Sequence, residues 1–394
     1  MSRSRAGAAA LLTALGLFAA CGGQSAGAPA APAAPPSGTG SAAPAPTTTA
    51  APASCATRTY DRLTEPQRFA QLVVVGVPAG GVSQAARTAL AREPGGIILT
   101  DGESASKDAV TKVVTSAQAT GGAEVPLLVA ADQEGGQVQE LEGPGFPTMP
   151  SALAQGRDAD GLRAAAKGWG DALRDVGVTV NLAPVADVVN PALGEANAPV
   201  GKFDRQYGDD VATASAGVQA FVAGMRDADV APTLKHFPGL GEVRQNTDFA
   251  GGVEDTVTGP DSPSLQSFAA GMKAGAPLVM MSSARYSEID PDEQALFSSR
   301  VMQDLLRERL GFDGVIMTDD VGAAAALEDT PVGARATKFL AAGGDLVLTI
   351  RPGDLAPMLD AITTAAREPA FAQRAQDAVR RVLTLKEQQG ILRC

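Results

Sequence analysis

Aromatic and basic side chains are both scarce in this sequence of 394 residues. Aromatic residues make up 4% of the chain, with one Trp and three Tyr, which argues against a long binding surface of stacked rings. The 32 Lys and Arg residues are outnumbered by 44 Asp and Glu residues, and the net charge is −12. Because binding to nucleic acid or to anionic lipid needs clustered basic residues, the composition argues against both as partners.

The N-terminal segment has the features of an export signal. Two arginines precede an apolar run over residues 6–20, which is too short to span a bilayer well. The run ends in Leu17-Phe18-Ala19-Ala20-Cys21, and small residues directly before a Cys resemble the lipidation site of bacterial lipoproteins. We therefore predict a signal peptide over residues 1–20 and a lipid on Cys21, which would anchor the protein at the outer face of the cytoplasmic membrane in the cell envelope. The alternative is an ordinary secretory signal with an incidental Cys.

The next segment lacks charged side chains altogether. After Cys21 it consists of Ala, Pro, Gly, Ser, Thr and one Gln, and it cannot bury enough apolar surface to offset its ordering entropy. We predict a flexible tether over residues 21–54, followed by one folded domain over residues 55–394. Cys55 and Cys394 stand at the two ends of this domain. In an oxidising compartment we expect them to form a disulfide, the alternative being two unpaired thiols.

The folded part alternates between strand-like and helix-like segments. The strand-like runs are mostly continuously apolar, as in parallel strands covered on both faces. They cover residues 72–77, 96–100, 127–131, 179–183, 233–236, 278–282, 314–318 and 345–349. Helical spacing occupies residues 83–93, 107–120, 159–176, 209–228, 264–274, 298–310, 331–342 and 368–389. Eight such alternations predict an α/β fold, a (β/α)₈ TIM-type barrel. An open doubly wound sheet is the alternative, but a dinucleotide-type glycine loop is missing after the first run.

Charged residues follow several of the apolar runs directly. Asp132 follows the third run, Lys235 and His236 end the fifth, and Asp319 follows the seventh. Functional side chains of such a barrel gather at the carboxyl ends of the strands, so we expect these residues to share one rim. Glycosidic-bond hydrolysis needs a carboxylate to meet the charge developing at the anomeric carbon and a second group to protonate the leaving oxygen. Asp319 is placed for the first task, and its charged neighbours suit hydrogen bonds to sugar hydroxyls.

Five segments in this order make the chain resemble glycoside hydrolase family 3, in its single-domain β-N-acetylglucosaminidase branch. The resemblance extends from about residue 60 to the C-terminus. The matching segments are Asp132-Gln133-Glu134-Gly135-Gly136-Gln137-Val138, residues 181–187, residues 201–208, Lys235-His236-Phe237-Pro238-Gly239, and Gly311-Phe312-Asp313-Gly314-Val315-Ile316-Met317-Thr318-Asp319-Asp320.

The resemblance implies a reaction and a set of site residues. Asp319 matches the nucleophile that forms a covalent glycosyl-enzyme, and the reaction is retaining hydrolysis without a metal or an organic cofactor. The positions that bind the terminal N-acetylglucosamine are matched by Asp132, Arg205, Lys235 and His236. The implied substrates in bacteria are peptidoglycan fragments and related N-acetylglucosaminides. We expect a monomer whose partner is a carbohydrate and whose membrane contact is the lipid anchor alone.

The sequence departs from this branch at the general acid/base. The Lys-His-Phe-Pro-Gly motif usually continues with His-Gly and then with an Asp-His pair, whereas here Leu240 replaces the first His and Asp248 stands near the second. Ser282-Ser283 stands where the branch has another His. The chain has one His, His236, so no His dyad can form.

Several outcomes are compatible with this departure. Glu242 or Asp248 takes over proton transfer, or the enzyme is limited to substrates with good leaving groups, or the barrel binds sugar without cleaving it. We favour retained hydrolysis, because the nucleophile and the binding residues are intact. A glycoside phosphorylase, in which phosphate replaces water, is a weaker alternative and needs a basic subsite.

The charged candidates also have structural explanations. Asp319 is a suitable helix N-cap, although the adjacent Asp320 would serve equally well. Lys235 could be paired inside the fold with Asp132 or Asp187. Each explanation is plausible for one residue, but several charged residues at strand ends favour a site.

Overall fold

The computed structural model of the protein describes residues 53–394. The predicted signal peptide, the predicted lipidation site Cys21 and nearly all of the predicted tether lie outside these residues. Helix α1 (Cys55–Arg62) begins the described fold, with the Ser54 hydroxyl accepting a hydrogen bond at its N-terminus. None of the helices in residues 53–394 is both long and apolar enough to cross a membrane.

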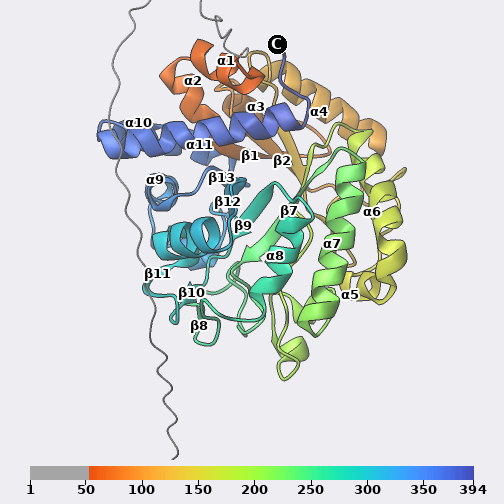
Figure 1. Ribbon diagram of the computed structural model, residues 1–394. Helices are drawn as coiled ribbons and strands as arrows, with labels where there is room; N and C mark the ends of the chain where they lie inside the picture. Colours follow the sequence, from red (N-terminus) through yellow and green to blue (C-terminus); the bar gives the residue numbers. More distant parts are fainter. Residues whose placement is uncertain (1–52) are drawn as a thin grey trace, which may run out of the picture. The chain divides into compact units, whose positions relative to one another are not determined.

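Eight parallel strands close into a barrel, which confirms the predicted α/β fold (Figure 1). Around the ring the order is β1-β2-β3-β6-β7-β9-β12-β13, and β13 pairs with β1. A closed ring has no edge strand, so the alternative of an open doubly wound sheet is wrong. The strands are β1 Val73–Pro78, β2 Gly96–Thr100, β3 Leu128–Ala131, β6 Val180–Asn181, β7 Ala231–Phe237, β9 Leu278–Met281, β12 Val315–Asp320 and β13 Leu346–Thr349.

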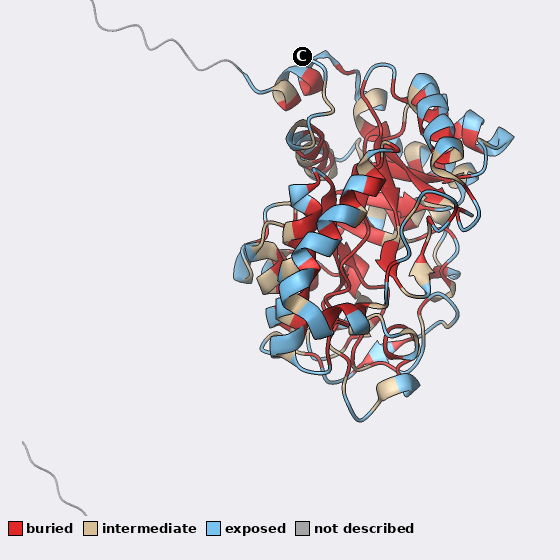
Figure 2. Ribbon diagram, turned by 90° about the vertical axis from the view of Figure 1, so that its right-hand side faces the viewer, coloured by how far each residue is buried: buried red, intermediate tan, exposed pale blue. Residues whose placement is uncertain are grey.

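Helices cover the outside of the barrel, with their buried faces against the strands (Figure 2). They are α1, α2 Glu65–Ala70, α3 Gln84–Leu90, α4 Lys107–Gly121, α5 Ala152–Gln155, α6 Ala159–Arg174, α7 Val211–Asp227, α8 Leu265–Lys273, α9 Val332–Ala342, α10 Leu355–Ala365 and α11 Pro369–Gln388, with a π-helical segment at Arg300–Arg309. Two small sheets extend the loops: β4 Gln133–Gly135 pairs with β5 Val138–Gln139, and β10 Arg285–Tyr286 pairs with β8 Glu254–Asp255 and β11 Asp290–Gln294.

Helix α10 was not predicted from the sequence. Pro357 interrupts its pattern and reads as a helix breaker. In the structure Pro357 is the third residue of α10, within the first turn. A backbone N–H has no partner inside the helix at that position, so Pro costs little there.

The interior of the barrel is filled by side chains. Residues of one parity along each strand, such as Ile98, Leu128 and Met317, form an inner cluster, to which Val382 and Leu385 of α11 add. Residues of the other parity pack outward against the helices. A TIM-type barrel of this kind is a packed core and no pore, so a ligand can bind only at its ends.

The two ends of the folded domain are joined. A disulfide links Cys55 to Cys394, and their Cα atoms are 5.8 Å apart. The carboxylate of Glu387 in α11 accepts hydrogen bonds from the backbone N–H groups of Cys55 and Ala56, at 2.8 and 3.1 Å. Helix α1 is therefore bonded covalently to the C-terminal residue and held against α11 by a carboxylate at its own N-terminus.

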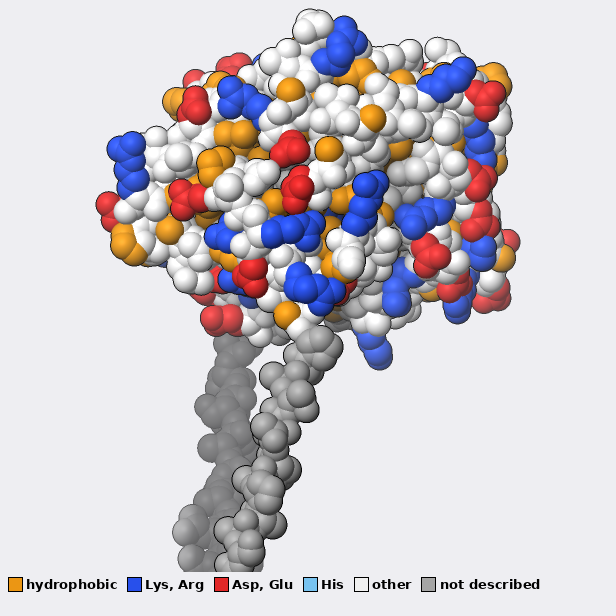
Figure 3. All heavy atoms as spheres, turned by 90° about the horizontal axis from the view of Figure 1, so that it is seen from above, with side chains coloured by type: hydrophobic (Ala, Val, Ile, Leu, Met, Phe, Trp, Pro, Cys, Tyr) orange, Lys and Arg blue, Asp and Glu red, His pale blue; other side chains and the backbone are white. Residues whose placement is uncertain are grey.

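Charged side chains of both signs are mixed over the surface. On the face shown in Figure 3, Lys and Arg side chains lie among Asp and Glu. Some form exposed pairs, such as Arg163 with Asp227 at 2.7 Å and Lys167 with Asp171 at 2.7 Å. Exposed pairs contribute only about 0–1 kcal/mol each, so the stability of the fold rests mainly on its apolar core.

One buried cation makes the stability of the fold depend on pH. Lys386 of α11 is fully buried, and its Nζ donates a hydrogen bond to Oε1 of Gln71 at 2.6 Å. Burial lowers its pKa from 10.5 to about 7. Between these two values the unfolded chain binds a proton that the folded chain does not, so stability rises with pH in this window. Below about pH 7 the buried charge destabilises the fold most.

We expect Lys386→Met to stabilise the protein by roughly 2–4 kcal/mol at pH 6, and by less at pH 9. Urea unfolding of both proteins at pH 6, 7, 8 and 9 measures this difference. Lys338→Met, which replaces an exposed lysine, is the matched control and leaves the pH dependence unchanged. Parallel stability curves for the wild type and Lys386→Met would show that the lysine does not titrate in this window.

Candidate active site

A polar pocket lies at the carboxyl ends of the barrel strands. Asp132 directly follows β3, Lys235 and His236 are among the last residues of β7, and Asp319 is near the end of β12. The connection between β6 and α7 adds Arg205, so strand ends and one connection meet at the same rim. The cavity has a volume of about 220 Å³ and is lined by Asp132, Val138, Pro199, Arg205, Lys235, His236, Leu240, Asn246, Thr247, Asp248 and Asp319.

An ion network contains three of the predicted binding residues, Asp132, Arg205 and Lys235. Arg205 forms a bidentate pair with Glu134, with Nε–Oε2 and Nη2–Oε1 distances of 2.8 and 2.7 Å. Nζ of Lys235 lies 2.5 Å from Oε1 of Glu134 and 2.5 Å from Oδ1 of Asp132. The side chain of Glu134 is 2% exposed and that of Asp132 is 31% exposed. Asp132 is therefore the carboxylate that a ligand can reach. The buried carboxylate of Glu134 holds the side chains of Arg205 and Lys235 in place.

Glu134 was quoted in a sequence motif but was not predicted as a site residue. Burial alone would raise the pKa of its carboxyl, but the positive charges of Arg205 and Lys235 lower it to about 2. Burial likewise disfavours the charge on Lys235, whereas Asp132 and Glu134 raise its pKa above the ordinary value. A sequence signal was present, because Glu134 is an acidic residue in a segment that directly continues a buried strand.

His236 is oriented by a second carboxylate. Its Nδ1 lies 2.8 Å from Oδ2 of Asp187, and its backbone N–H donates to Oδ1 of the same residue at 3.1 Å. Nη2 of Arg205 lies 3.4 Å from Nε2 of His236. Since a guanidinium can only donate, Nε2 accepts, and Nδ1 carries the proton that is donated to Asp187. Asp187 thus pairs with His236. Lys235 pairs with Asp132 and Glu134, so the pairing of Lys235 with Asp187 that the sequence left open is wrong.

The two adjacent aspartates of β12 have different surroundings. Asp320 accepts backbone N–H bonds from Gly322, Ala323 and Ile350 at 2.8–2.9 Å, so it caps the turn after the strand. Asp319 lines the pocket, and its Oδ1 accepts a bond from the backbone N–H of Asp320 at 2.8 Å. The structural role considered for Asp319 therefore belongs to Asp320, and the carboxylate of Asp319 faces the cavity.

The two predicted acid/base candidates are separated by the structure. Asp248 lines the pocket, where desolvation and the negative charge of Asp319 raise its pKa from 3.8 to about 6. Glu242 does not line it, and its Oε2 accepts a hydrogen bond from Nδ2 of Asn190 at 2.8 Å. The structure thus gives no support to Glu242 as an acid/base, because the loop after β7 directs it toward the β6–α7 connection.

The loop that carries Asp248 is held in place by its backbone. The N–H groups of Ala325 and Ala326 donate to the carbonyl groups of Asp248 and Thr247, at 3.2 and 3.1 Å. The side chain of Asn246 accepts a bond from the backbone N–H of Asp248 at 2.9 Å. These contacts tie the loop after β7 to the segment after β12, and Asp248 and Asp319 consequently face the same cavity.

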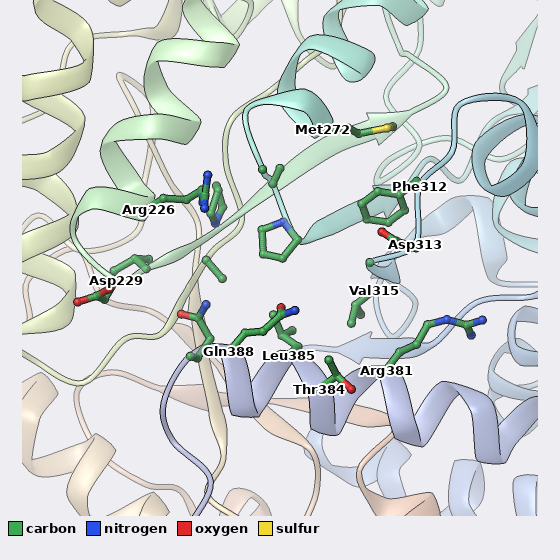
Figure 4. A pocket seen from close by; sticks show the side chains of 18 of the residues that line it. Arg226, Asp229, Met272, Phe312, Asp313, Val315, Arg381, Thr384, Leu385 and Gln388 are labelled. Atoms are coloured by element: carbon green, nitrogen blue, oxygen red, sulfur yellow. The ribbon is translucent and has the colours of Figure 1, made fainter. Parts of the chain in front are cut away.

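A larger cavity of about 1040 Å³ lies at the opposite end of the barrel (Figure 4). It is formed where β7, β9 and β12 begin, beside α11, and Arg226, Asp229 and Phe312 are among its lining residues. None of the residues predicted to act on a sugar lines this cavity. The predicted catalytic and sugar-binding residues all belong to the rim at the carboxyl ends of the strands, so we assign the chemistry to the smaller pocket there.

Comparison with known proteins agrees with the motifs. The profile of the glycosyl hydrolase family 3 N-terminal domain matches residues 65–385. The beta-hexosaminidase of Xanthomonas euvesicatoria pv. vesicatoria is 33% identical over 306 residues, with the match covering 74% of this chain and 87% of that protein. The beta-hexosaminidase of Xylella fastidiosa (strain M12) is 39% identical over 237 residues, covering 58% of this chain and 68% of that protein.

Solved structures give the same result. A beta-N-acetylhexosaminidase from Beutenbergia cavernae superposes with a TM-score of 0.80 at 45% identity, covering 82% of this chain and 99% of that chain. A family 3 beta-N-acetylglucosaminidase from Paenibacillus sp. superposes with a TM-score of 0.75 at 31% identity, covering 84% of this chain and 63% of that chain. The protein is therefore a member of glycoside hydrolase family 3, as the order of its motifs predicted.

Proposed function

We propose that this protein is a retaining β-N-acetylhexosaminidase that removes terminal β-linked N-acetylglucosamine. The observation that carries the proposal is the carboxylate of Asp319 in a pocket whose cations are already fixed by Glu134. The beta-hexosaminidase and beta-N-acetylglucosaminidase relatives support the choice of sugar. Peptidoglycan-derived fragments are the substrates that we propose for a protein of the cell envelope.

The proposed reaction has two steps. In the first, an oxygen of Asp319 bonds to the anomeric carbon while the glycosidic bond breaks, and Asp248 donates its proton to the leaving oxygen. In the second, Asp248 takes a proton from water, the water oxygen bonds to the anomeric carbon, and the bond to Asp319 breaks. Asp132, Arg205, Lys235 and His236 line the pocket and orient the sugar, and Lys235 also holds the carboxylate of Asp132 in place.

The charge balance of the pocket favours water over phosphate as the second substrate. A phosphorylase would need a cation left available for phosphate. In the pocket, Arg205 is paired with Glu134, and Lys235 is paired with both Glu134 and Asp132. When phosphate would have to enter in place of water, Asp319 is bonded to the sugar, and the carboxylate of Asp248, which has given up its proton, would repel it. These neighbours support hydrolysis.

One assay distinguishes a hydrolase from a phosphorylase and from a sugar-binding protein without catalysis. The purified domain is incubated with a chromogenic N-acetylglucosaminide, with and without inorganic phosphate, beside Asp319→Ala. Release by the wild type alone, independent of phosphate, supports the hydrolase. Strict dependence on phosphate supports the phosphorylase, and binding of N-acetylglucosamine without turnover supports a sugar-binding protein that has lost catalysis.

We expect the pH profile of the reaction to report Asp248. Only its protonated form can donate to the leaving oxygen, so kcat/KM falls as the pH rises above about 6. Asp248→Asn removes this limb and lowers kcat/KM for N,N′-diacetylchitobiose by roughly 10²–10⁴-fold. With N-acetylglucosaminyl fluoride, whose leaving group needs little protonation, the loss is much smaller. Glu242→Gln is the matched control, and a limb that disappears in that variant would transfer the acid/base role to Glu242.

The lipid anchor and the location of the protein stay proposals. We propose that Cys21 is acylated and that the domain is held at the outer face of the cytoplasmic membrane as a monomer. Labelled palmitate should be incorporated into the wild type and not into Cys21→Ser. Light scattering of the soluble domain measures its oligomeric state.

A further inference from the structure

The loop after β7 exposes one aromatic side chain beside the proposed acid/base. Phe249 is 83% exposed, the highest value among the large hydrophobic residues in the described part of the chain. It directly follows Asn246, Thr247 and Asp248, all of which line the pocket. Its backbone N–H donates to the carbonyl of Asn246 at 3.1 Å, so the turn that positions Asp248 also positions Phe249.

Other rings that could stack on a sugar are used by the fold. Tyr207 and Tyr286 are buried, and Trp169 packs against the buried ring of Phe221 with a centroid distance of 6.3 Å. Tyr60 is covered by guanidinium groups of two arginines. The pocket itself contains no Phe, Tyr or Trp among its lining residues. Phe249 is therefore the one strongly exposed aromatic side chain of residues 53–394, and it directly follows a residue that lines the pocket.

The location of Phe249 in the chain, directly after the proposed acid/base, suggests that its ring contacts the leaving group. A sugar whose anomeric carbon meets Asp319 fills the pocket, and its leaving oxygen must face Asp248. The group attached to that oxygen therefore leaves the pocket beside Asp248, the residue that directly precedes Phe249 in the chain. A pyranose ring has an apolar face of C–H groups, which is complementary to the face of an aromatic ring.

We propose that Phe249 is the platform of an aglycone subsite, which selects substrates whose leaving group is itself a pyranose. This proposal rests on the proposed glycosidase function and deepens it. Polar contacts in the pocket recognise the terminal N-acetylglucosamine, and stacking on Phe249 recognises the next sugar. Phe249 is thus a specificity-determining residue and takes no part in the bond-breaking steps.

The test compares the binding of one sugar with that of two. Calorimetry on the Asp319→Ala protein, which prevents turnover, gives Kd for N-acetylglucosamine and for N,N′-diacetylchitobiose. We expect the disaccharide to bind about ten-fold more tightly, because stacking on an aromatic ring contributes about 1 kcal/mol or more. Adding Phe249→Ala should reduce this ratio to about one while the Kd of the monosaccharide stays within two-fold. Adding Phe249→Trp should preserve the ratio.

Val257→Ala is the matched control, because Val257 is also exposed, at 60%, and its neighbours do not line the pocket. An unchanged ratio in Phe249→Ala overturns the proposal, as does an equal loss of affinity for both sugars or no binding of either. Hydrolysis by the wild type is measured separately with N-acetylglucosaminyl fluoride. If the wild type does not hydrolyse this substrate, the glycosidase function is contradicted. The Kd ratio, in contrast, tests the subsite alone.

Discussion

Replacing Asp319 with Asn is expected to lower kcat/KM for a chromogenic N-acetylglucosaminide by about four orders of magnitude or more. An amide cannot form the glycosyl-enzyme, and the acid/base and binding groups cannot compensate for the missing nucleophile. The melting temperature should change little, because the amide oxygen can still accept the bond from the N–H of Asp320. Initial rates and thermal unfolding of the purified variant measure both quantities.

Asp320→Asn is the matched control for this prediction. Asp320 accepts three backbone N–H bonds, and an amide can offer only one oxygen to them. We expect a loss of stability of about 1–3 kcal/mol and a much smaller loss of rate than in Asp319→Asn. The opposite pattern, with activity lost at 320 and retained at 319, would exchange the roles of the two aspartates.

The second large effect concerns Glu134 and stability. Glu134→Gln removes one of two carboxylates that neutralise Arg205 and Lys235, and it leaves a buried positive charge without compensation. Breaking a buried ion network in this way costs roughly 3–5 kcal/mol. Urea unfolding at pH 7 measures the change in the free energy of unfolding. Activity should fall as well, since both cations lose the partner that orients them.

Two variants test the physical reason for this effect. Asp171→Asn breaks an exposed pair with Lys167 and should change stability by no more than about 0.5 kcal/mol. Glu134→Gln combined with Lys235→Met restores the charge balance and should recover part of the lost stability. If the double variant loses more unfolding free energy than the two single variants together, the uncompensated charge is not the cause.

The pKa of Glu134 gives the same network a pH dependence. Its folded value of about 2 lies below the ordinary value of 4.5. A carboxylate with a lowered pKa contributes stability that is fully present above the unfolded value and is lost as the pH falls toward the folded value. The wild type should therefore lose stability between about pH 4.5 and 2, and Glu134→Gln should lose less of it over that window.

The order of elements and the location of the site could be predicted from local patterns. Continuous apolar runs predicted strands such as β2 and β9, because a strand buried on both faces needs no polar alternation. The charged residues after those runs then had to lie at one rim, since all strands of a barrel point the same way. Asp132, Lys235 and Asp319 were found in this manner, and the structure places them in one pocket.

Partners and orientations within the site could not be predicted so well. Asp319 and Asp320 are adjacent in sequence, and successive side chains of a strand point in opposite directions, so only the barrel decides which one faces the cavity. Glu242 and Asp248 likewise stand six residues apart on one loop, and the contact of that loop with Ala325 and Ala326 brings Asp248 to the pocket.

The (β/α)₈ architecture and the family follow from the order of residues alone, because both depend on periodicity and on short motifs in a fixed order. The fold was needed to show that Glu134 neutralises the cations, that Asp248 shares a cavity with Asp319, and that Phe249, next to Asp248 in the chain, is exposed. Charge state, desolvation and exposure depend on neighbours from distant parts of the chain, which no local pattern contains.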